Sequence, residues 1–140
     1  MVDKALLLRK FTELEEYLAQ IREYADITLE TYSHDWKIQR IVERTLQMMI
    51  EICVDIAGHI ISDKEYRIPK SYADTFKVLY EEKIISKELY EDMKNMAKFR
   101  NIIVHQYDKI DEIIIVNILK KHLGDFVIFK DTIINCQLKL

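Results

Sequence analysis

The chain has 140 residues, of which 49% are hydrophobic and 32% are charged, and its formal net charge at pH 7 is −3. That length suits one domain with a substantial core, and we expect a single domain over residues 1–140. Only two glycines and one proline are present, which excludes glycine-rich nucleotide-binding loops and disfavours folds that are rich in tight turns.

The first two predicted elements are long amphipathic helices. Apolar residues recur at helical spacing from Val2 to about Tyr32, which predicts one continuous helix. A polar break follows, in which Ser33 or Asp35 is available as an N-cap. The next apolar stripe predicts a second long helix from about Asp35 to Ile61.

Shorter helices fill the rest of the chain. The only proline and Ser71 mark the start of a helix over about Tyr72–Glu81, and Ser86 opens another that runs to about Val104. A last helix begins near Asp111; Gly124 ends or kinks it, and the apolar spacing continues over Phe126–Leu138. The fold class that these elements predict is all-α, an antiparallel bundle of four to five helices.

Metal, disulfide and membrane signals are weak. The two cysteines, Cys53 and Cys136, make no disulfide framework, and the four histidines show no zinc-ligand spacing. The N-terminal apolar run is too short for a signal peptide, and no stretch approaches 18 uncharged apolar residues. We therefore expect a cytoplasmic protein with no metal, no cofactor and no membrane segment.

The segment Lys98–Tyr107 carries the strongest chemical signal. It places Arg100, Asn101, His105 and Tyr107 within eight residues at the end of a predicted helix. Arginine binds phosphate oxygens through two N–H groups and stays charged, and histidine exchanges a proton near neutral pH. Such a pair can cleave RNA without a metal, because imidazole moves the proton of the attacking 2′-hydroxyl while guanidinium stabilises the phosphate charge.

The spacing of the two candidate residues raises a geometric question. Side chains five positions apart on a straight helix point about 140° away from each other. Arg100 and His105 therefore converge only if the helix ends before His105, or if a second copy of the chain completes the site. The second arrangement makes dimerisation part of the mechanism.

A second candidate pair lies on the second predicted helix. Asp55 and His59 are four residues apart and share one helix face. They form either an ordinary hydrogen-bonded pair on the helix surface or a pair that lines a cleft.

Four segments, in order along the chain, resemble the HepT-like family of HEPN-domain toxins. They match the family's second-helix pattern, its P-x-S-Y-x-D-x-F stretch, its R-x4-H-x-Y motif and its L-x-D-F-x-x-F ending. The similarity runs from the first helix to about Phe129. The matching segments are Arg44–Ile60, Pro69–Phe76, Phe99–Tyr107 and Leu123–Phe129.

The resemblance implies a homodimeric helical bundle that acts as a metal-independent endoribonuclease toxin. By this likeness Arg100 and His105 are catalytic, and Asn101 supports the site. The implied partner is an MNT-domain nucleotidyltransferase antitoxin (MntA-like) that transfers AMP onto Tyr107. A phosphate-linked adenosine there would bring negative charge and bulk into the RNA cleft.

Two other functions remain open at this point. The chain could be a non-catalytic helical module that docks a nucleotidyltransferase and binds nucleotide or nucleic acid at Arg100. It could also be a purely structural partner. Substitution of His105 separates catalysis from binding, since a binding module tolerates the loss of that imidazole.

Overall fold

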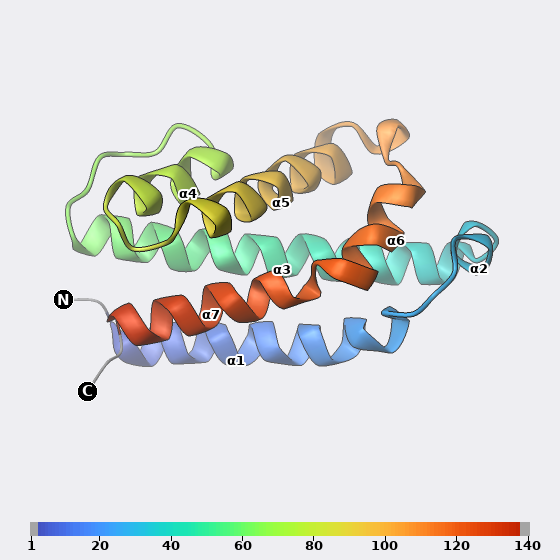
Figure 1. Cartoon of the computed structure of the whole chain (residues 1–140), viewed down its shortest axis with the longest axis horizontal. Coiled ribbons are helices and arrows are strands. Elements are labelled where there is room, and N and C mark those ends of the chain that lie inside the picture. The colour runs from blue at the N-terminus through green and yellow to red at the C-terminus, as the bar shows by residue number, and fades with distance from the viewer. Residues whose placement is uncertain (1–2, 138–140) are drawn as a thin grey trace.

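A computed structural model of the chain describes residues 3–137 (Figure 1). Within this range the chain forms seven α-helices and two short 3-10 helices, with no strand, so the predicted all-α class is confirmed. Val2 and Leu138, which bound two of the predicted segments, lie outside the described residues. The elements are α1 (Lys4–Ile21), η1 (Arg22–Tyr24), α2 (Leu29–Ser33), α3 (Trp36–Asp63), α4 (Tyr72–Glu81), α5 (Lys87–His105), η2 (Tyr107–Lys109), α6 (Glu112–Lys121) and α7 (Leu123–Gln137).

The predicted helix starts are confirmed where a side chain caps the first turn. The Asp35 carboxylate accepts hydrogen bonds from the backbone N–H groups of Lys37 and Ile38 at the start of α3. Ser71 and Ser86 cap α4 and α5 in the same way. Each cap satisfies backbone donors that have no partner inside the helix.

The first predicted helix is too long. It ends at Ile21, and the chain passes through η1 before it resumes as α2. Thr28 has extended backbone (φ −79, ψ 155) because its hydroxyl caps α2 by accepting from the N–H of Thr31. This break lets α2 pack on α3 and α6 and buries Tyr32 completely. Leu29 continues the apolar spacing of α1, yet its side chain is exposed.

The C-terminal part also breaks at a different residue from the predicted one. α6 ends at Lys121 and α7 begins at Leu123, with His122 between them (φ −120, ψ 1). Gly124 lies inside α7 and has no positive φ. The first break divides one predicted helix into α1 and α2, and the second divides another into α6 and α7, so the described chain has seven α-helices rather than four or five.

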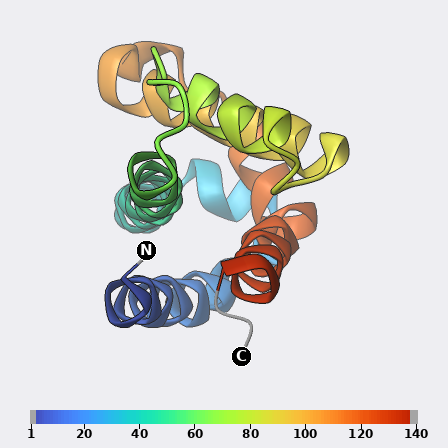
Figure 2. The ribbon, with the colours of Figure 1, turned by 90° about the vertical axis from the view of Figure 1, so that its left-hand side faces the viewer.

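α3 is the central helix and contacts α1, α4, α5 and α7. The end-on view shows α1 and α7 on one side of the molecule and α4 and α5 on the other (Figure 2). The two groups meet in the core, where the rings of Phe76 and Phe129 pack edge to face at 5.7 Å. α2 and α6 cover one end of the bundle, next to the C-terminal end of α5 (Figure 1).

Among the described helices, only α3 is long and apolar enough to cross a membrane by length and composition, with a mean hydropathy of 1.3 over 18 residues. Half of that window is buried inside the protein. A central helix that supplies core residues to several neighbours needs the same composition, so this finding is weak evidence for a membrane segment.

Candidate active site and modification site

Arg100 is held in place by residues from three parts of the fold. On α5, its Nε and Nη2 atoms lie 2.9 and 2.8 Å from Oε2 of Glu51, which belongs to α3. Its Nη1 donates to the side-chain oxygen of Asn101 at 3.3 Å. The ring of Tyr72, at the start of α4, lies 4.6 Å from the guanidinium carbon. The side chain is 15% exposed, and these contacts orient the guanidinium.

The donors of Arg100 are only partly used by these contacts. A guanidinium has five N–H groups. Glu51 accepts the one on Nε and Asn101 accepts one on Nη1, while Nη2 is in ion-pair contact with Glu51. Within residues 3–137, one N–H on each terminal nitrogen has no protein acceptor. These two groups are available to an anion such as a phosphate.

Glu51 is itself held by a neighbour on α3. The side-chain amide of Gln47, one turn earlier, donates to Oε2 of Glu51 at 3.0 Å. The same carboxylate oxygen therefore accepts from both Gln47 and Arg100. This network directs the guanidinium of Arg100 from α5 toward α3.

His105 is the last residue of α5 and is exposed to solvent. The helix runs without interruption through both Arg100 and His105, which excludes the possibility that it ends before the histidine. On such a helix the two side chains diverge by about 140° and their Cα atoms are about 7.5 Å apart along the axis. In the described part of the chain no hydrogen bond joins them, and a continuous helix directs the two side chains to different sides of α5.

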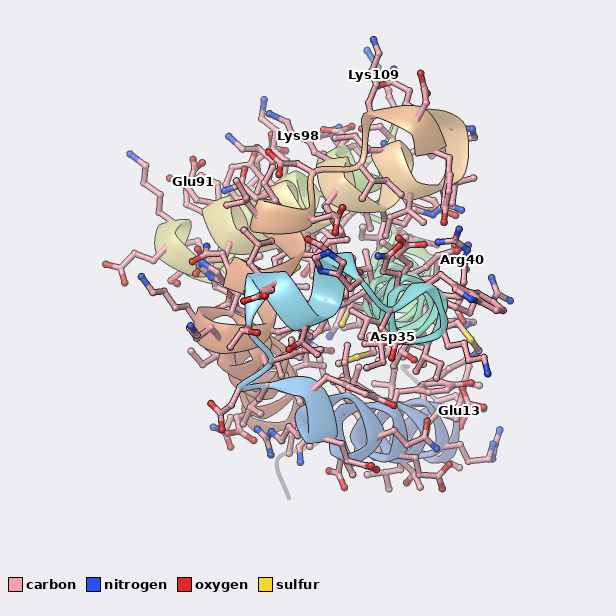
Figure 3. The ribbon with its side chains drawn as sticks, turned by 90° about the vertical axis from the view of Figure 1, so that its right-hand side faces the viewer. Glu13, Asp35, Arg40, Glu91, Lys98 and Lys109 are labelled. Carbon is pink, nitrogen blue, oxygen red and sulfur yellow. The ribbon has the colours of Figure 1, made fainter. Side chains whose placement is uncertain are left out.

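Tyr107 lies in η2, directly after α5, and reaches back to α3. Its hydroxyl donates to Oε1 of Glu43 at 2.6 Å. The guanidinium of Arg40 lies over the ring, 5.3 Å from its centre. Burial and the contact with Glu43 raise the pKa of Tyr107 above its ordinary value, although 47% of the residue remains exposed. Figure 3 faces this end of the molecule and labels Arg40 on α3 and Lys109 in η2.

Asp55 and His59 line a groove of about 910 Å³ bordered by α1, α3 and α4. Asp55 pairs with Lys10 of α1 at 2.8 Å, and Nε2 of His59 lies 3.7 Å from the other carboxylate oxygen. The hydrogen bond with Asp55 is the main cause of a raised pKa for Lys10. Glu51 and Tyr72, which hold Arg100, line the same groove. The pair is thus placed at a cleft next to the arginine network.

The two cysteines, Cys53 and Cys136, are both free thiols. Cys53 is buried and Cys136 is exposed, and burial places the pKa of the Cys53 thiol well above its usual range. Among residues 3–137, no group of three or more His, Cys, Asp and Glu side chains is arranged to hold a metal ion.

The sequence did not single out the residues that hold the two sites. Glu51 occurs in the family-like pattern of the second helix, but nothing in that pattern connects it with Arg100, 49 residues away. Glu43 is 64 residues from Tyr107 and carries no motif signal at all. Tyr72 lies in the P-x-S-Y-x-D-x-F stretch, which likewise gives no sign of a contact with Arg100. Spacing along a chain does not report contacts between helices, so only the fold reveals these partners.

Comparison with known proteins shows the family of the chain. The family model described as "Ribonuclease HepT-like" matches residues 14–133. The mRNA nuclease HepT of Shewanella oneidensis is 32% identical over 91% of this chain and 96% of its own length. The tRNA nuclease HepT of Aphanizomenon flos-aquae is 29% identical over 79% of this chain and 75% of its own length.

A solved structure extends the likeness to three dimensions. The tri-AMPylated HEPN toxin of Shewanella oneidensis, in complex with an MNT antitoxin, superimposes with a TM-score of 0.86. It is 30% identical, and the match covers 94% of this chain and 98% of that one. With the family model, the curated relatives and the fold in agreement, the chain belongs to the HepT-like ribonuclease family.

Proposed function

We propose that this chain is the metal-independent endoribonuclease toxin of a HEPN/MNT toxin–antitoxin pair, acting on RNA in the cytoplasm. Two of its relatives are named as nucleases of mRNA and tRNA. The observation that carries the proposal is the fixed guanidinium of Arg100, which keeps two N–H groups free on the helix that ends with the exposed imidazole of His105.

In the proposed reaction, His105 accepts the proton of a ribose 2′-hydroxyl while that oxygen attacks the adjacent phosphorus. The bond between the phosphorus and the 5′-oxygen of the next nucleotide breaks, and that oxygen takes a proton from water, which gives a 2′,3′-cyclic phosphate and a 5′-hydroxyl end. The free N–H groups of Arg100 donate to the phosphate oxygens, where negative charge increases in the transition state. Asn101 contributes by holding Nη1 of the guanidinium.

Because one chain does not join Arg100 and His105, we propose that the active unit is a homodimer. Arg100 of one protomer then acts with the partner's His105. Most of the exposed large apolar side chains among residues 3–137 lie at the end of the molecule that carries these motifs, which supports contact with another chain there. They are Leu29, Trp36, Ile41, Val104, Tyr107, Ile113 and Ile114.

Asp55 and His59 receive a supporting role in this proposal. The groove that they line begins beside Glu51 and Tyr72, so an RNA strand bound at Arg100 has a path along it. Lys10, which pairs with Asp55, offers a positive charge to a phosphate. The ring of Tyr72 offers a face on which a base can stack.

The proposed mechanism predicts that metal chelation has little effect. Purified protein with an RNA substrate should cleave at the same rate, within about twofold, with and without excess EDTA, because imidazole and guanidinium replace the functions of a metal. Cleavage is measured on gels of end-labelled RNA. Loss of cleavage with EDTA and its return with Mg²⁺ would show that a metal takes part.

We further propose that a cognate MNT-type nucleotidyltransferase adds AMP to Tyr107. The related Shewanella toxin is described as tri-AMPylated and in complex with such an antitoxin. The ring of Tyr107 is half exposed, two residues after His105. Each added AMP brings a negative phosphate next to the position at which RNA would bind, so the modified protein should bind RNA less well.

Incubation with MgATP and the cognate nucleotidyltransferase should therefore add one or more AMP units to the chain. Intact-mass spectrometry measures the addition, and the Tyr107→Phe variant, which lacks only the acceptor oxygen, should remain unmodified. RNA cleavage by the modified wild-type protein should fall in proportion to the modified fraction. Modification of Tyr107→Phe to the same extent would place the acceptor at another residue.

A further inference from the structure

A partly buried polar cluster surrounds the hydroxyl of Tyr107 where α2, α3, η2 and α6 meet. Besides Tyr107 it contains Tyr32, Arg40, Glu43 and Glu112. Tyr32 is fully buried, and neither its hydroxyl nor Oε2 of Glu112 has a hydrogen-bond partner among the described residues. Burial and the charges of the two glutamates hold the pKa of Tyr32 well above its usual range. The cluster therefore holds two carboxylates, Glu43, which is 7% exposed, and Glu112, one oxygen of which is buried.

Glu43 is the member that contacts the oxygen to be modified. It is 7% exposed, and its Oε1 accepts the Tyr107 hydroxyl at 2.6 Å. A distance this short is typical of a hydroxyl that donates to a carboxylate. The nearest cation is Arg40, whose Nη1 lies 3.6 Å from the same oxygen. The acceptor tyrosine thus has a carboxylate in place on its hydroxyl before any nucleotide arrives.

The phenol needs such a group in order to react. Its pKa lies above the ordinary value of a tyrosine, so the hydroxyl keeps its proton at neutral pH. A protonated hydroxyl is a weak nucleophile, and nucleophiles of this kind are activated by an adjacent base within hydrogen-bond distance. Glu43 meets that geometric condition.

We propose that Glu43 is the base for AMP transfer to Tyr107, an inference that rests on the AMP transfer proposed above. The Tyr107 oxygen attacks the α-phosphorus of ATP, and its proton passes to Oε1 of Glu43. A bond forms between the tyrosine oxygen and the phosphorus, and the bond between the α-phosphorus and the bridging oxygen breaks. Pyrophosphate leaves with that electron pair. Arg40, over the tyrosine ring, offers a positive charge to the approaching phosphates.

The test is the Glu43→Gln variant in the complete system, with the cognate MNT-type nucleotidyltransferase and MgATP. Glutamine keeps the size of the side chain and an oxygen that accepts the tyrosine hydroxyl, but it does not take the proton. We expect kcat for AMP addition to fall by about 10²-fold or more, with KM for MgATP unchanged. Glu112→Gln removes the other carboxylate of the cluster and should leave kcat within about twofold.

Each outcome has a distinct meaning. If the wild-type chain itself gains no AMP, the proposed modification fails. If the wild type is modified and Glu43→Gln reacts at the same rate, the base belongs to the nucleotidyltransferase and the role of Glu43 is refuted. A faster Glu43→Gln variant also refutes it, because the hydrogen bond to Glu43 would then slow the reaction of the Tyr107 hydroxyl. Thermal unfolding of both glutamine variants, compared with wild type, separates these results from a loss of folding.

Discussion

Replacement of His105 by alanine is expected to lower the rate of RNA cleavage by at least about 10²-fold, the usual size of a general acid–base contribution. In cells that lack the antitoxin, induction of the wild-type chain should stop growth and degrade RNA, whereas induction of His105→Ala at a matched level should do neither. His105 is exposed at the end of α5, so its removal should not disturb the core. Growth curves and gels of total RNA measure both effects together.

Two other results would redirect the functional conclusion. Equal behaviour of wild type and His105→Ala, with intact RNA in both, would favour the non-catalytic module that binds nucleotide or nucleic acid at Arg100. If Arg100→Gln and Tyr107→Phe were silent as well, the chain would be a structural partner only. Glutamine is the suitable replacement for Arg100, because its amide still donates to Glu51 and leaves that partly buried carboxylate with a partner.

A mixture of two inactive variants is expected to regain activity if the site is shared between protomers. Arg100→Gln and His105→Ala each lose one group, and in a mixed dimer the intact Arg100 of one protomer meets the partner's His105. With random exchange, half of the dimers are mixed and each has one intact site of two, so about a quarter of the wild-type rate should return. The measurement is RNA cleavage after the two proteins are unfolded and refolded together.

The control is each variant refolded alone, which should stay inactive. Two affinity tags, one on each variant, allow the mixed dimers to be isolated and their presence verified. Mixed dimers without cleavage activity would contradict the shared site. That result would mean that Arg100 and His105 of the same chain act together after a conformational change of α5.

Local sequence determines much of the helical framework. Asp35, Ser71 and Ser86 start their helices because a side-chain oxygen accepts from backbone donors two or three residues ahead, which is a short-range interaction. The end of α1 is different. Its apolar spacing continues through Leu29, but the chain turns at Thr28 so that Tyr32 is buried between helices. That choice depends on packing with α3 and α6, which periodicity does not encode.

The sequence by itself determined the fold class and located the candidate site in the R-x4-H-x-Y segment. It also showed that Arg100 and His105 meet only if the helix ends before His105 or a second copy of the chain completes the site. It did so because helical periodicity, caps and motif spacing are all local properties. Only the tertiary structure decided that α5 is continuous through His105, and that Glu51 and Tyr72 hold Arg100. It likewise revealed the carboxylate of Glu43 on the hydroxyl of Tyr107. These contacts join residues far apart in the chain, and they arise from the way helices pack around α3.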